Sequence, residues 1–249
     1  MKSLNFFSGM ALLLATASVL ICGNTSVAAQ SVLSFSGHEW KVRPYGASRR
    51  APGPNYYSDS RENAWVDEKG QLHLKIVKKD GNWYCVEVVC DKSLGYGTYT
   101  FYLASRVDRI NENAILGLFT WSDSPEYDHR EVEFEFSRWG NPLDDNAQCV
   151  VQPYEVEGNM SRFSLDIKGD YSTHIITWKK DYINFLSLRG DNPVPADEKD
   201  RVFSWKYTGR GIPVPGNENV RMNLWLFHGQ PPSDEKEVEV IIKRFEWRP

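Results

Sequence analysis

The chain has few of the residues from which metal centres and disulfide frameworks are built: among its 249 residues are five histidines and four cysteines. Cys22 lies in an N-terminal apolar segment, which leaves Cys85, Cys90 and Cys149. No His or Cys group with zinc-ligand spacing accompanies them, so the sequence predicts no metal site. Cys85 and Cys90 are five residues apart in a predicted strand and point to opposite faces, which argues against a bridge between them. One disulfide plus one free thiol remains open for an exported chain.

An excess of positive charge is also lacking. The chain has 29 Lys and Arg against 33 Asp and Glu, a net charge of -4, and the basic residues are scattered. This composition argues against nucleic acid and anionic membrane surfaces as partners, and it favours a neutral ligand. Aromatic residues make up 13% of the chain, including nine Trp, which suit stacking on sugar faces as well as core packing.

Long hydrophobic runs are absent after the N-terminus, so no membrane span is expected. The first segment has Lys2, an apolar run over 10–21 and small residues that end at Ala29, which together predict a signal peptide over 1–29. A lipoprotein signal at Cys22 is disfavoured because Ile21 stands where a small residue is needed. We therefore expect a secreted or periplasmic protein in which residues 30–249, about 220 residues, form a single domain and a monomer.

Helical periodicity is scarce, whereas short alternating runs between Gly, Pro, Asn and Asp recur throughout. The fold class predicted is all-β, a β-sandwich or barrel of two antiparallel sheets. Residues 38–60 are expected to be irregular and to wrap the sandwich edge, and 191–200 to be a surface excursion. Strands are predicted over 64–66, 72–78, 83–89, 97–104, 114–121, 131–137, 148–152, 161–167, 172–179, 182–187, 219–227 and 237–247.

The most informative pattern is a strict alternation of acidic and apolar residues from position 131 to 136. On a strand, Glu131, Glu133 and Glu135 project to one face, and the intervening apolar residues turn into the core. Three adjacent carboxylates repel and raise one another's pKa values, as acid and base chemistry requires. The alternative is a solvated outer strand face that discourages edge pairing. A row of three Glu without an interleaved cation is mutually destabilising, so the pattern alone leaves both readings open.

Several residues near this row in the sequence or in a similar alternation are predicted to bind substrate. Trp121 ends a strand just before the acidic segment, and Trp139 lies at the loop mouth after it. Gln148 and Gln152 share one face of the following strand, which a short loop would make an antiparallel neighbour. Asn223 and Trp225 share one face of a late strand. The alternative for the Trp residues is ordinary core packing.

These residues resemble a known family. Glu-x-Asp-x-Glu on a strand is the signature of glycoside hydrolase family 16, and residues 131–135 resemble it. Residues 93–99 are similar to the segment that leads into that family's cleft strands. His174 to Trp178 looks like its His-x-x-x-Trp strand, and 223–225 like its late cleft strand. These matches stand in the family's order between about residues 63 and 247.

The resemblance implies a concanavalin A-like β-jelly roll with an open groove for a polysaccharide. It implies that Glu131 is the nucleophile, Glu135 the general acid/base and Glu133 the helper that orients the nucleophile. Glu133 stands where the family has Asp, which adds one methylene. No cofactor is implied. A structural Ca²⁺ is common among relatives, but the resemblance points to no ligands for it in this sequence.

The carboxyl geometry expected of the mechanism is independent of the family. Retention needs carboxyl groups about 5–5.5 Å apart and inversion about 6.5–9.5 Å. Four strand residues span roughly 13 Å, so the outer side chains must lean inward across a concave sheet. The spacing leaves both routes open, and the resemblance implies retention.

The leading hypothesis is an exported, endo-acting hydrolase of β-glucan or a related β-linked polysaccharide. The alternatives are a transglycosylase, a lectin-like carbohydrate-binding protein on the same fold, and an envelope scaffold without a sugar site.

Overall fold

The computed structural model describes residues 31–44, 46–192 and 197–249, and its regular structure is almost entirely β-strand. The predicted signal peptide lies outside these residues, as do 193–196 of the predicted excursion. In chain order the strands are β1 (Val32–Phe35), β2 (His38–Val42), β3 (Tyr56–Tyr57), β4 (Ala64–Val66), β5 (Leu72–Lys79), β6 (Asn82–Cys90), β7 (Gly97–Leu103), β8 (Ala114–Trp121), β9 (Val132–Phe136), β10 (Ala147–Val151), β11 (Met160–Phe163), β12 (Ser172–Trp178), β13 (Ile183–Arg189), β14 (Arg201–Tyr207), β15 (Asn219–Leu226) and β16 (Val238–Arg248). Four 3-10 turns accompany them, η1 (Val107–Arg109), η2 (Asp128–Arg130), η3 (Glu198–Asp200) and η4 (Phe227–Gly229).

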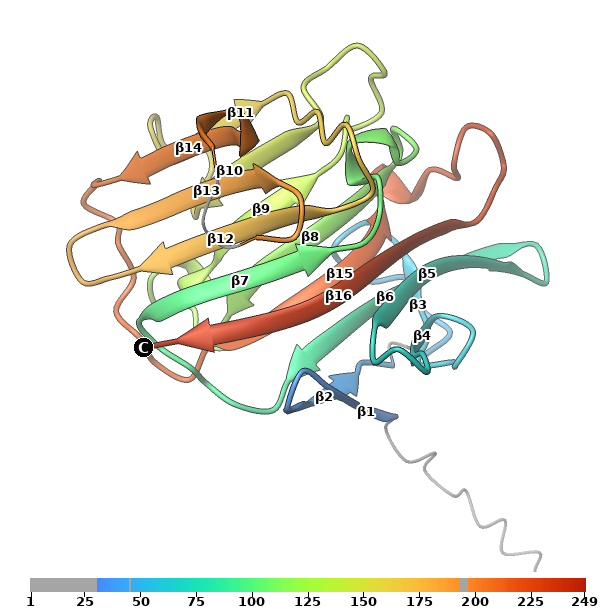
Figure 1. The fold of residues 1–249 in the computed structure, drawn as a ribbon. Coiled ribbons are helices and arrows are strands. Elements are labelled where there is room, and N and C mark those ends of the chain that lie inside the picture. The colour runs from blue at the N-terminus through green and yellow to red at the C-terminus, as the bar shows by residue number, and fades with distance from the viewer. Residues whose placement is uncertain (1–30, 45, 193–196) are drawn as a thin grey trace, which may run out of the picture.

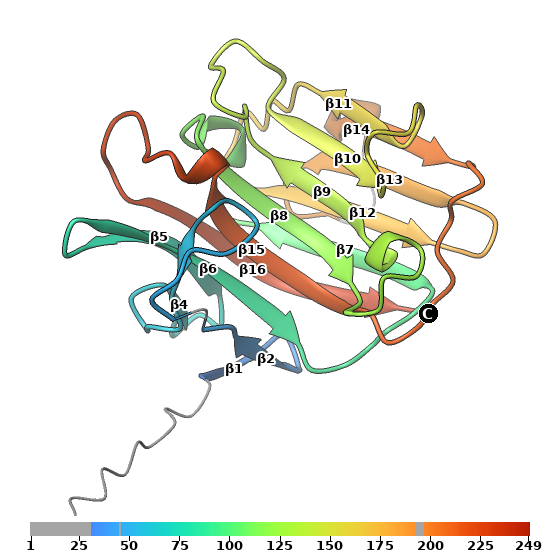
Figure 2. The ribbon, with the colours of Figure 1, turned by 180° about the vertical axis from the view of Figure 1, so that it is seen from behind.

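The strands form two stacked layers, seen from opposite sides in Figures 1 and 2. One layer, which we call the groove sheet, has the order β1-β2-β6-β15-β8-β9-β10-β11. The other, the back sheet, has the order β4-β5-β16-β7-β12-β13-β14. All of these pairings are antiparallel; the short β3 pairs with β6 in parallel. The predicted all-β jelly-roll sandwich is confirmed.

The two layers are joined at the hairpin of β5 and β6. Asp80 and Gly81 both have positive φ, at 49° and 78°, as a two-residue hairpin turn requires. The strands pair only next to this turn, between residues 77–79 and 82–84. Beyond it β5 continues in the back sheet and β6 in the groove sheet.

The inward face of β9 fills the space between the layers. The ring of Phe134 lies 5.3 Å from that of Phe185 on β13, edge to face, and the ring of Phe136 lies 4.5 Å from that of His174 on β12. His174 is fully buried between the hydroxyls of Ser172 and Ser187, and burial lowers its pKa to about 3. A neutral histidine therefore belongs to the core, and the apolar half of the acidic strand is anchored against the back sheet.

The structure corrects the sequence interpretation at several places. Residues 38–60 are not irregular throughout: they contain β2 and the short β3. Trp40 and Val42 of β2 are buried between exposed neighbours, an alternation that the basic and Pro-containing continuation of the segment obscured. β1 and β14 were not predicted, and β11 ends at Phe163 instead of residue 167. β9 begins at Val132, so Glu131 precedes the strand.

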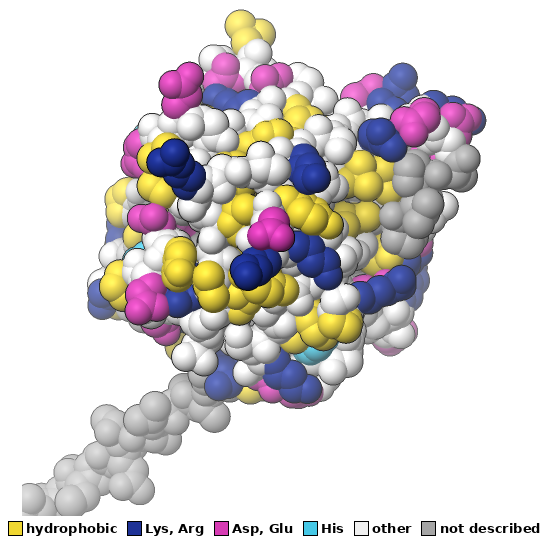
Figure 3. Space-filling view, turned by 90° about the vertical axis from the view of Figure 1, so that its left-hand side faces the viewer, with side chains coloured by type: hydrophobic (Ala, Val, Ile, Leu, Met, Phe, Trp, Pro, Cys, Tyr) yellow, Lys and Arg dark blue, Asp and Glu magenta, His cyan; other side chains and the backbone are white. Residues whose placement is uncertain are grey.

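The cysteines of the described domain are all reduced, and on one face the surface charges are mixed in sign. Cys85, Cys90 and Cys149 are buried free thiols, so the disulfide that the sequence left open is not formed among them. Figure 3 shows acidic and basic side chains interspersed with apolar ones on the face that it presents. On that face the charges are mixed, as the weak net charge of the sequence leads one to expect.

Candidate active site

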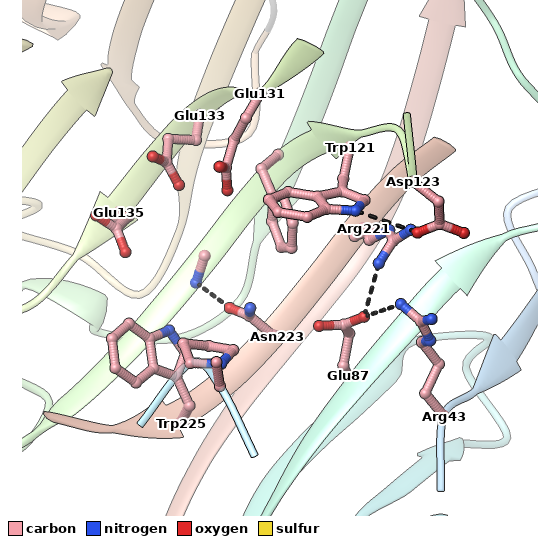
Figure 4. Close-up of a pocket in the computed structure, with 14 residues that line it drawn as sticks. Arg43, Glu87, Trp121, Asp123, Glu131, Glu133, Glu135, Arg221, Asn223 and Trp225 are labelled. Carbon is pink, nitrogen blue, oxygen red and sulfur yellow. Dashed lines mark hydrogen bonds and ion pairs between the residues drawn. The ribbon is translucent and has the colours of Figure 1, made fainter. Parts of the chain in front are cut away.

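Three carboxyl groups lie in a row on the outer face of the groove sheet. Glu133 and Glu135 belong to β9, and Glu131 directly follows η2. Figure 4 shows the carboxyl groups of Glu131 and Glu133 side by side, with Glu135 farther along the strand. All three line one hollow, of which Glu133 is the most deeply placed, with 5% of its surface exposed.

Sheet register brings further polar residues into line with the acid row. Glu135 pairs with Gln148 on β10 and with Gly117 on β8. Gly117 pairs with Asn223 on β15, and Asn223 pairs with Glu87 on β6. The N–H of Gly117 donates to Asn223 Oδ1 at 3.1 Å, and a Cβ at position 117 would lie 2.5 Å from that oxygen. Only glycine therefore lets the Asn223 amide lie this close to the sheet.

Two glutamines hold two of the carboxyl groups. Gln148 Nε2 donates to Glu135 Oε2 at 2.7 Å, and Gln152 Nε2 donates to Glu133 Oε1 at 2.9 Å. β10 lies antiparallel to β9, as expected from the short intervening loop. The sequence predicted both glutamines as substrate-binding residues; in the structure their amides contact the acids and restrict the orientation of each carboxyl group.

The pKa values of all three acids are raised. Burial is the leading cause for each, and it raises the pKa of Glu131 from 4.5 to about 8, with the negative charge of Glu135 adding to the shift. The pKa of Glu133 is raised well above its usual range by burial and by both neighbouring carboxylates, against the hydrogen bond from Gln152. Burial also raises the pKa of Glu135, against the Gln148 amide and the Arg162 charge. The sequence correctly predicted a raised pKa for Glu135, but the rise was attributed to the neighbouring negative charge and not to burial.

The acid row is expected to make the folded protein less stable as the pH rises. Folded carboxyl groups with raised pKa values bind more protons than the unfolded chain, so the free energy of unfolding falls between about pH 4.5 and pH 8. The Glu133→Gln variant removes one buried ionisable group whose pKa is raised, and its side-chain oxygen can still accept the Gln152 hydrogen bond. We expect its Tm at about pH 8 to exceed the wild-type value by at least about 2–4 °C, the shift that corresponds to 1 kcal/mol in a chain of this size.

Thermal unfolding of both proteins between about pH 5 and pH 8 measures this effect. Glu68→Gln, in an exposed turn, is the matched control and should leave the wild-type pH slope unchanged. A Glu133→Gln protein that is less stable than wild type at every pH would show that the charge of Glu133 is compensated in the fold.

Trp121 stands at one side of the row, at the end of β8. The ring of His129 stacks on its indole, with centroids 4.2 Å apart and planes 6° apart, so one face of Trp121 is covered. Residues 127–130 all have positive φ, between 49° and 63°, although none is glycine. The buried Arg130 fixes this strained turn by donating through Nε to the carbonyl of Val214 at 2.8 Å. The turn thus holds His129 and the start of the acid row in a defined position.

A network of ion pairs forms the floor beyond Trp121. Arg43 Nη1 and Arg221 Nη1 lie 3.2 and 3.4 Å from Glu87 Oε1. Arg221 Nη2 lies 3.2 Å from Asp123 Oδ1, which also accepts a hydrogen bond from Trp121 Nε1 at 3.2 Å. Figure 4 shows this network on the side of the acid row where Trp121 lies. The positive charge of Arg221 also opposes the rise in the pKa of Glu131.

The hollow continues on the other side of the acid row. One part, of about 460 Å³, contains the ion-pair network, and a second, of about 500 Å³, contains Trp139, Gln148 and Gln152. Both parts share the three acids, Pro52 and Trp225, so the acids occupy the middle of a continuous groove. The guanidinium of Arg162 lies 4.2 Å from the ring centre of Trp139 and covers one of its faces.

All nine sequence-predicted site residues line this groove. Sequence reasoning missed Arg43, Glu87, Asp123 and Arg221 as groove residues. Arg221 stands two positions before Asn223, so the same strand alternation carried the signal. Glu87 carried none, because its position follows only from the pairing of β6 with β15, two strands far apart in the sequence.

Comparison with known proteins supports the fold. The chain matches no protein-family model and no curated protein sequence. In structure it is similar to the pseudo-β-1,3-glucanase Rv0315 of Mycobacterium tuberculosis, with 17% identity, a TM-score of 0.62 and coverage of 84% of this chain and 90% of that one. A β-1,3-glucanase of Mycobacterium marinum is 16% identical, with a TM-score of 0.61 and coverage of 87% and 93%. A Bacillus licheniformis β-glucanase is 15% identical, with a TM-score of 0.58 and coverage of 84% and 92%. The fold is therefore that of the β-glucanases, as the sequence resemblance implied.

Membrane insertion through a helix finds no support in the part of the chain that the structure describes. None of its helices has the length and apolar character needed to span a bilayer.

Proposed function

We propose that this protein is an exported, endo-acting glycoside hydrolase that cleaves β-glucan or a related β-linked polysaccharide with retention of configuration. Glu131 acts as the nucleophile, Glu135 as the general acid/base and Glu133 as the helper. The observation that supports this most strongly is the position of the three carboxyl groups in the middle of a groove that extends to both sides. A groove open on both sides of the reacting bond suits cleavage within a chain.

The assigned roles require one acid of the row to be ionised while another keeps its proton. Because burial raises the pKa of Glu131 to about 8, the fraction of protein with Glu131 ionised grows as the pH rises toward 8. In the reactive form Glu131 is ionised and attacks the anomeric carbon, and Glu135 retains its proton and delivers it to the leaving oxygen. Glu135 then removes a proton from the water that cleaves the glycosyl-enzyme bond. Gln148 and Gln152 act as positioning residues for Glu135 and Glu133. Because one acid must be ionised and another protonated, kcat/KM is expected to depend on pH as a bell-shaped curve.

Sugar binding is supported by aromatic and polar groups on both sides of the acids. His129 covers one face of Trp121, and the Arg221 guanidinium lies 5.6 Å from the centre of the same ring. Arg162 covers one face of Trp139, and the opposite face of Trp139 can stack on a sugar ring. Trp225 contacts both parts of the groove, next to Asn223.

The test of the proposed function is incubation of the purified protein with β-1,3-, β-1,4- and mixed-linkage glucans, with new reducing ends as the readout. An endo-acting hydrolase releases reducing ends from at least one glucan and lowers its viscosity early. A transglycosylase instead gives longer products when acceptor is abundant. A protein that releases no reducing ends from any member of the panel contradicts the proposal.

A second candidate function is carbohydrate binding without turnover. Two observations favour it: Glu133 stands where the resembled family has Asp, and one structure with the same fold is described as a pseudo-β-1,3-glucanase. The longer side chain shifts the helper carboxyl group by one methylene.

The Glu133→Asp variant distinguishes these candidates. In an enzyme the shorter acid is expected to keep kcat/KM within about threefold of wild type or to raise it, because aspartate has the same charge and restores the spacing of the resembled motif. Glu133→Ala serves as the control for loss of the carboxyl group and should be much slower. Binding to immobilised glucan with no hydrolysis by either wild type or Glu133→Asp favours the binding protein.

A further inference from the structure

Away from the groove, three side chains with metal-binding atoms meet at the edge of the groove sheet. His38 lies on β2, Cys90 ends β6 and Asp91 follows it. β2 and β6 are antiparallel neighbours in which Trp40 pairs with Cys90, so His38 and Cys90 project from the same face. One potential ligand atom from each of the three residues lies within 4.8 Å of the others. They form the one such group of His, Cys and carboxylate side chains found among the described residues.

Within the fold, the polar atoms of this group make few hydrogen bonds. Nδ1 of His38 is buried and has no hydrogen-bond partner among the described residues, although a buried imidazole nitrogen is normally satisfied. The Cys90 sulfur has a weak contact of 4.0 Å with Asp91 Oδ1. The backbone N–H groups of Lys92 and Asp91 also point at the Cys90 sulfur. Amides that point at a sulfur in this way also suit a metal-bound thiolate.

We propose that His38 Nδ1, Cys90 Sγ and an Asp91 carboxylate oxygen bind a Zn²⁺ ion, with water as the fourth ligand. Ligands of a tetrahedral zinc ion at about 2.0–2.3 Å stand roughly 3.3–3.8 Å apart, so the three side chains need to close by about 1 Å. Asp91 is exposed and free to make this adjustment. On binding, the Cys90 thiol releases its proton to solvent and the thiolate forms the zinc bond. A thiolate and an imidazole do not suit Ca²⁺, which takes oxygen ligands.

The bound ion would connect two strands at the sheet edge. β2 and β1 form a hairpin whose attachment to this sheet runs through the pairing of β2 with β6. A metal that bridges His38 to Cys90 and Asp91 fastens that hairpin, so its effect is on stability and not on the acid row. No pattern in the sequence indicates this site, because His38 and Cys90 are far apart in the chain and approach only through strand pairing.

Calorimetric titration of ZnCl₂ into chelator-treated full-length protein tests the proposal, and CaCl₂ is the comparison. One zinc ion per chain, an increase in Tm with zinc and no comparable effect of calcium are expected. Replacing zinc by Co²⁺ should produce a near-ultraviolet thiolate charge-transfer band. Asp91→Asn and Cys90→Ser should weaken zinc binding at least about 10–100-fold, and Cys90→Ser should also remove the cobalt band. Asp91 is exposed, so its variant is expected to fold even if Cys90→Ser does not.

Two matched controls locate the site. Cys149→Ser changes another buried thiol. His73→Gln changes a histidine outside the proposed site, whose Nδ1 lies 2.6 Å from Glu239 Oε1. Both should bind zinc as wild type does. Absence of zinc binding, binding unaffected by Asp91→Asn and Cys90→Ser, or binding lost in His73→Gln would each overturn the proposal. Glucan hydrolysis is not a readout here, so the outcome is independent of the proposed enzymatic function.

Discussion

The Glu131→Gln variant is expected to hydrolyse glucan at least about 10⁴-fold more slowly than wild type, because an amide cannot form the glycosyl-enzyme bond. Gln has nearly the same size as Glu and keeps the polar lining of the groove. The affinity for an oligosaccharide product of the same glucan should therefore stay within about threefold. Kinetics on the glucan selected by the panel, together with calorimetric binding, measures both quantities.

The comparison of kcat with affinity is what makes this variant decisive. Glu68→Gln is a control: Glu68 is exposed in a turn and does not line the groove. That variant should retain wild-type kcat. If Glu131→Gln kept more than about a tenth of wild-type kcat, Glu131 would not be the nucleophile.

The Glu135→Gln variant is expected to reduce kcat on natural glucan by about 10²–10⁴-fold, the usual contribution of a general acid or base. The size of the loss should depend on the leaving group. The nitrophenolate of a nitrophenyl glycoside leaves without being protonated. Replacing Glu135 should therefore slow formation of the glycosyl-enzyme far less with that substrate than with glucan. A burst of nitrophenol followed by slow turnover is then expected, because Glu135 is also needed to activate water in the second step.

Presteady-state measurement of nitrophenol release on wild type, Glu135→Gln and Glu131→Gln tests this assignment. Glu131→Gln should show no burst, since it lacks the nucleophile. An equal loss of activity on glucan and on the nitrophenyl glycoside in Glu135→Gln would mean that Glu135 does not protonate the leaving group. Exchange of the two phenotypes between the variants would reverse the assigned roles.

The alternation of residues 131–136 correctly predicted which side chains share a face of the strand. A period of two fixes which side chains share a face, so Glu133 and Glu135 on one side and Phe134 and Phe136 on the other follow directly from the sequence. The same rule placed Asn223 and Trp225 together. These local relations hold in any sheet that contains the strands.

Alternation within a strand does not predict which distant strands become neighbours in the sheet. Glu87 and Arg43 enter the groove only because β6 lies between β15 and β2, a strand order that local periodicity does not specify. The same holds for His38 and Cys90. Burial is a second limit: the leading cause of the raised pKa values is removal of the acids from water, which depends on how deep the groove is and not on their spacing.

Short and irregular elements were the other source of error. β2 alternates as clearly as β9, but the basic and Pro-containing residues that follow it suggested a loop for the whole segment. The strained turn at 127–130 was not foreseen, because four successive non-glycine residues with positive φ are maintained by tertiary contacts of Arg130. Local preference would place none of them in that conformation.

Covalent trapping tests most directly the claim that this acid row forms a retaining active site. An activated 2-deoxy-2-fluoro glycoside derived from the glucan that the protein cleaves should inactivate the wild-type protein. Mass spectrometry of its peptides should then find one sugar adduct, on Glu131, and none in Glu131→Gln. Hydrolysis of glucan by a protein that acquires no adduct, or acquires it on a residue outside the row of Glu131, Glu133 and Glu135, would contradict the account.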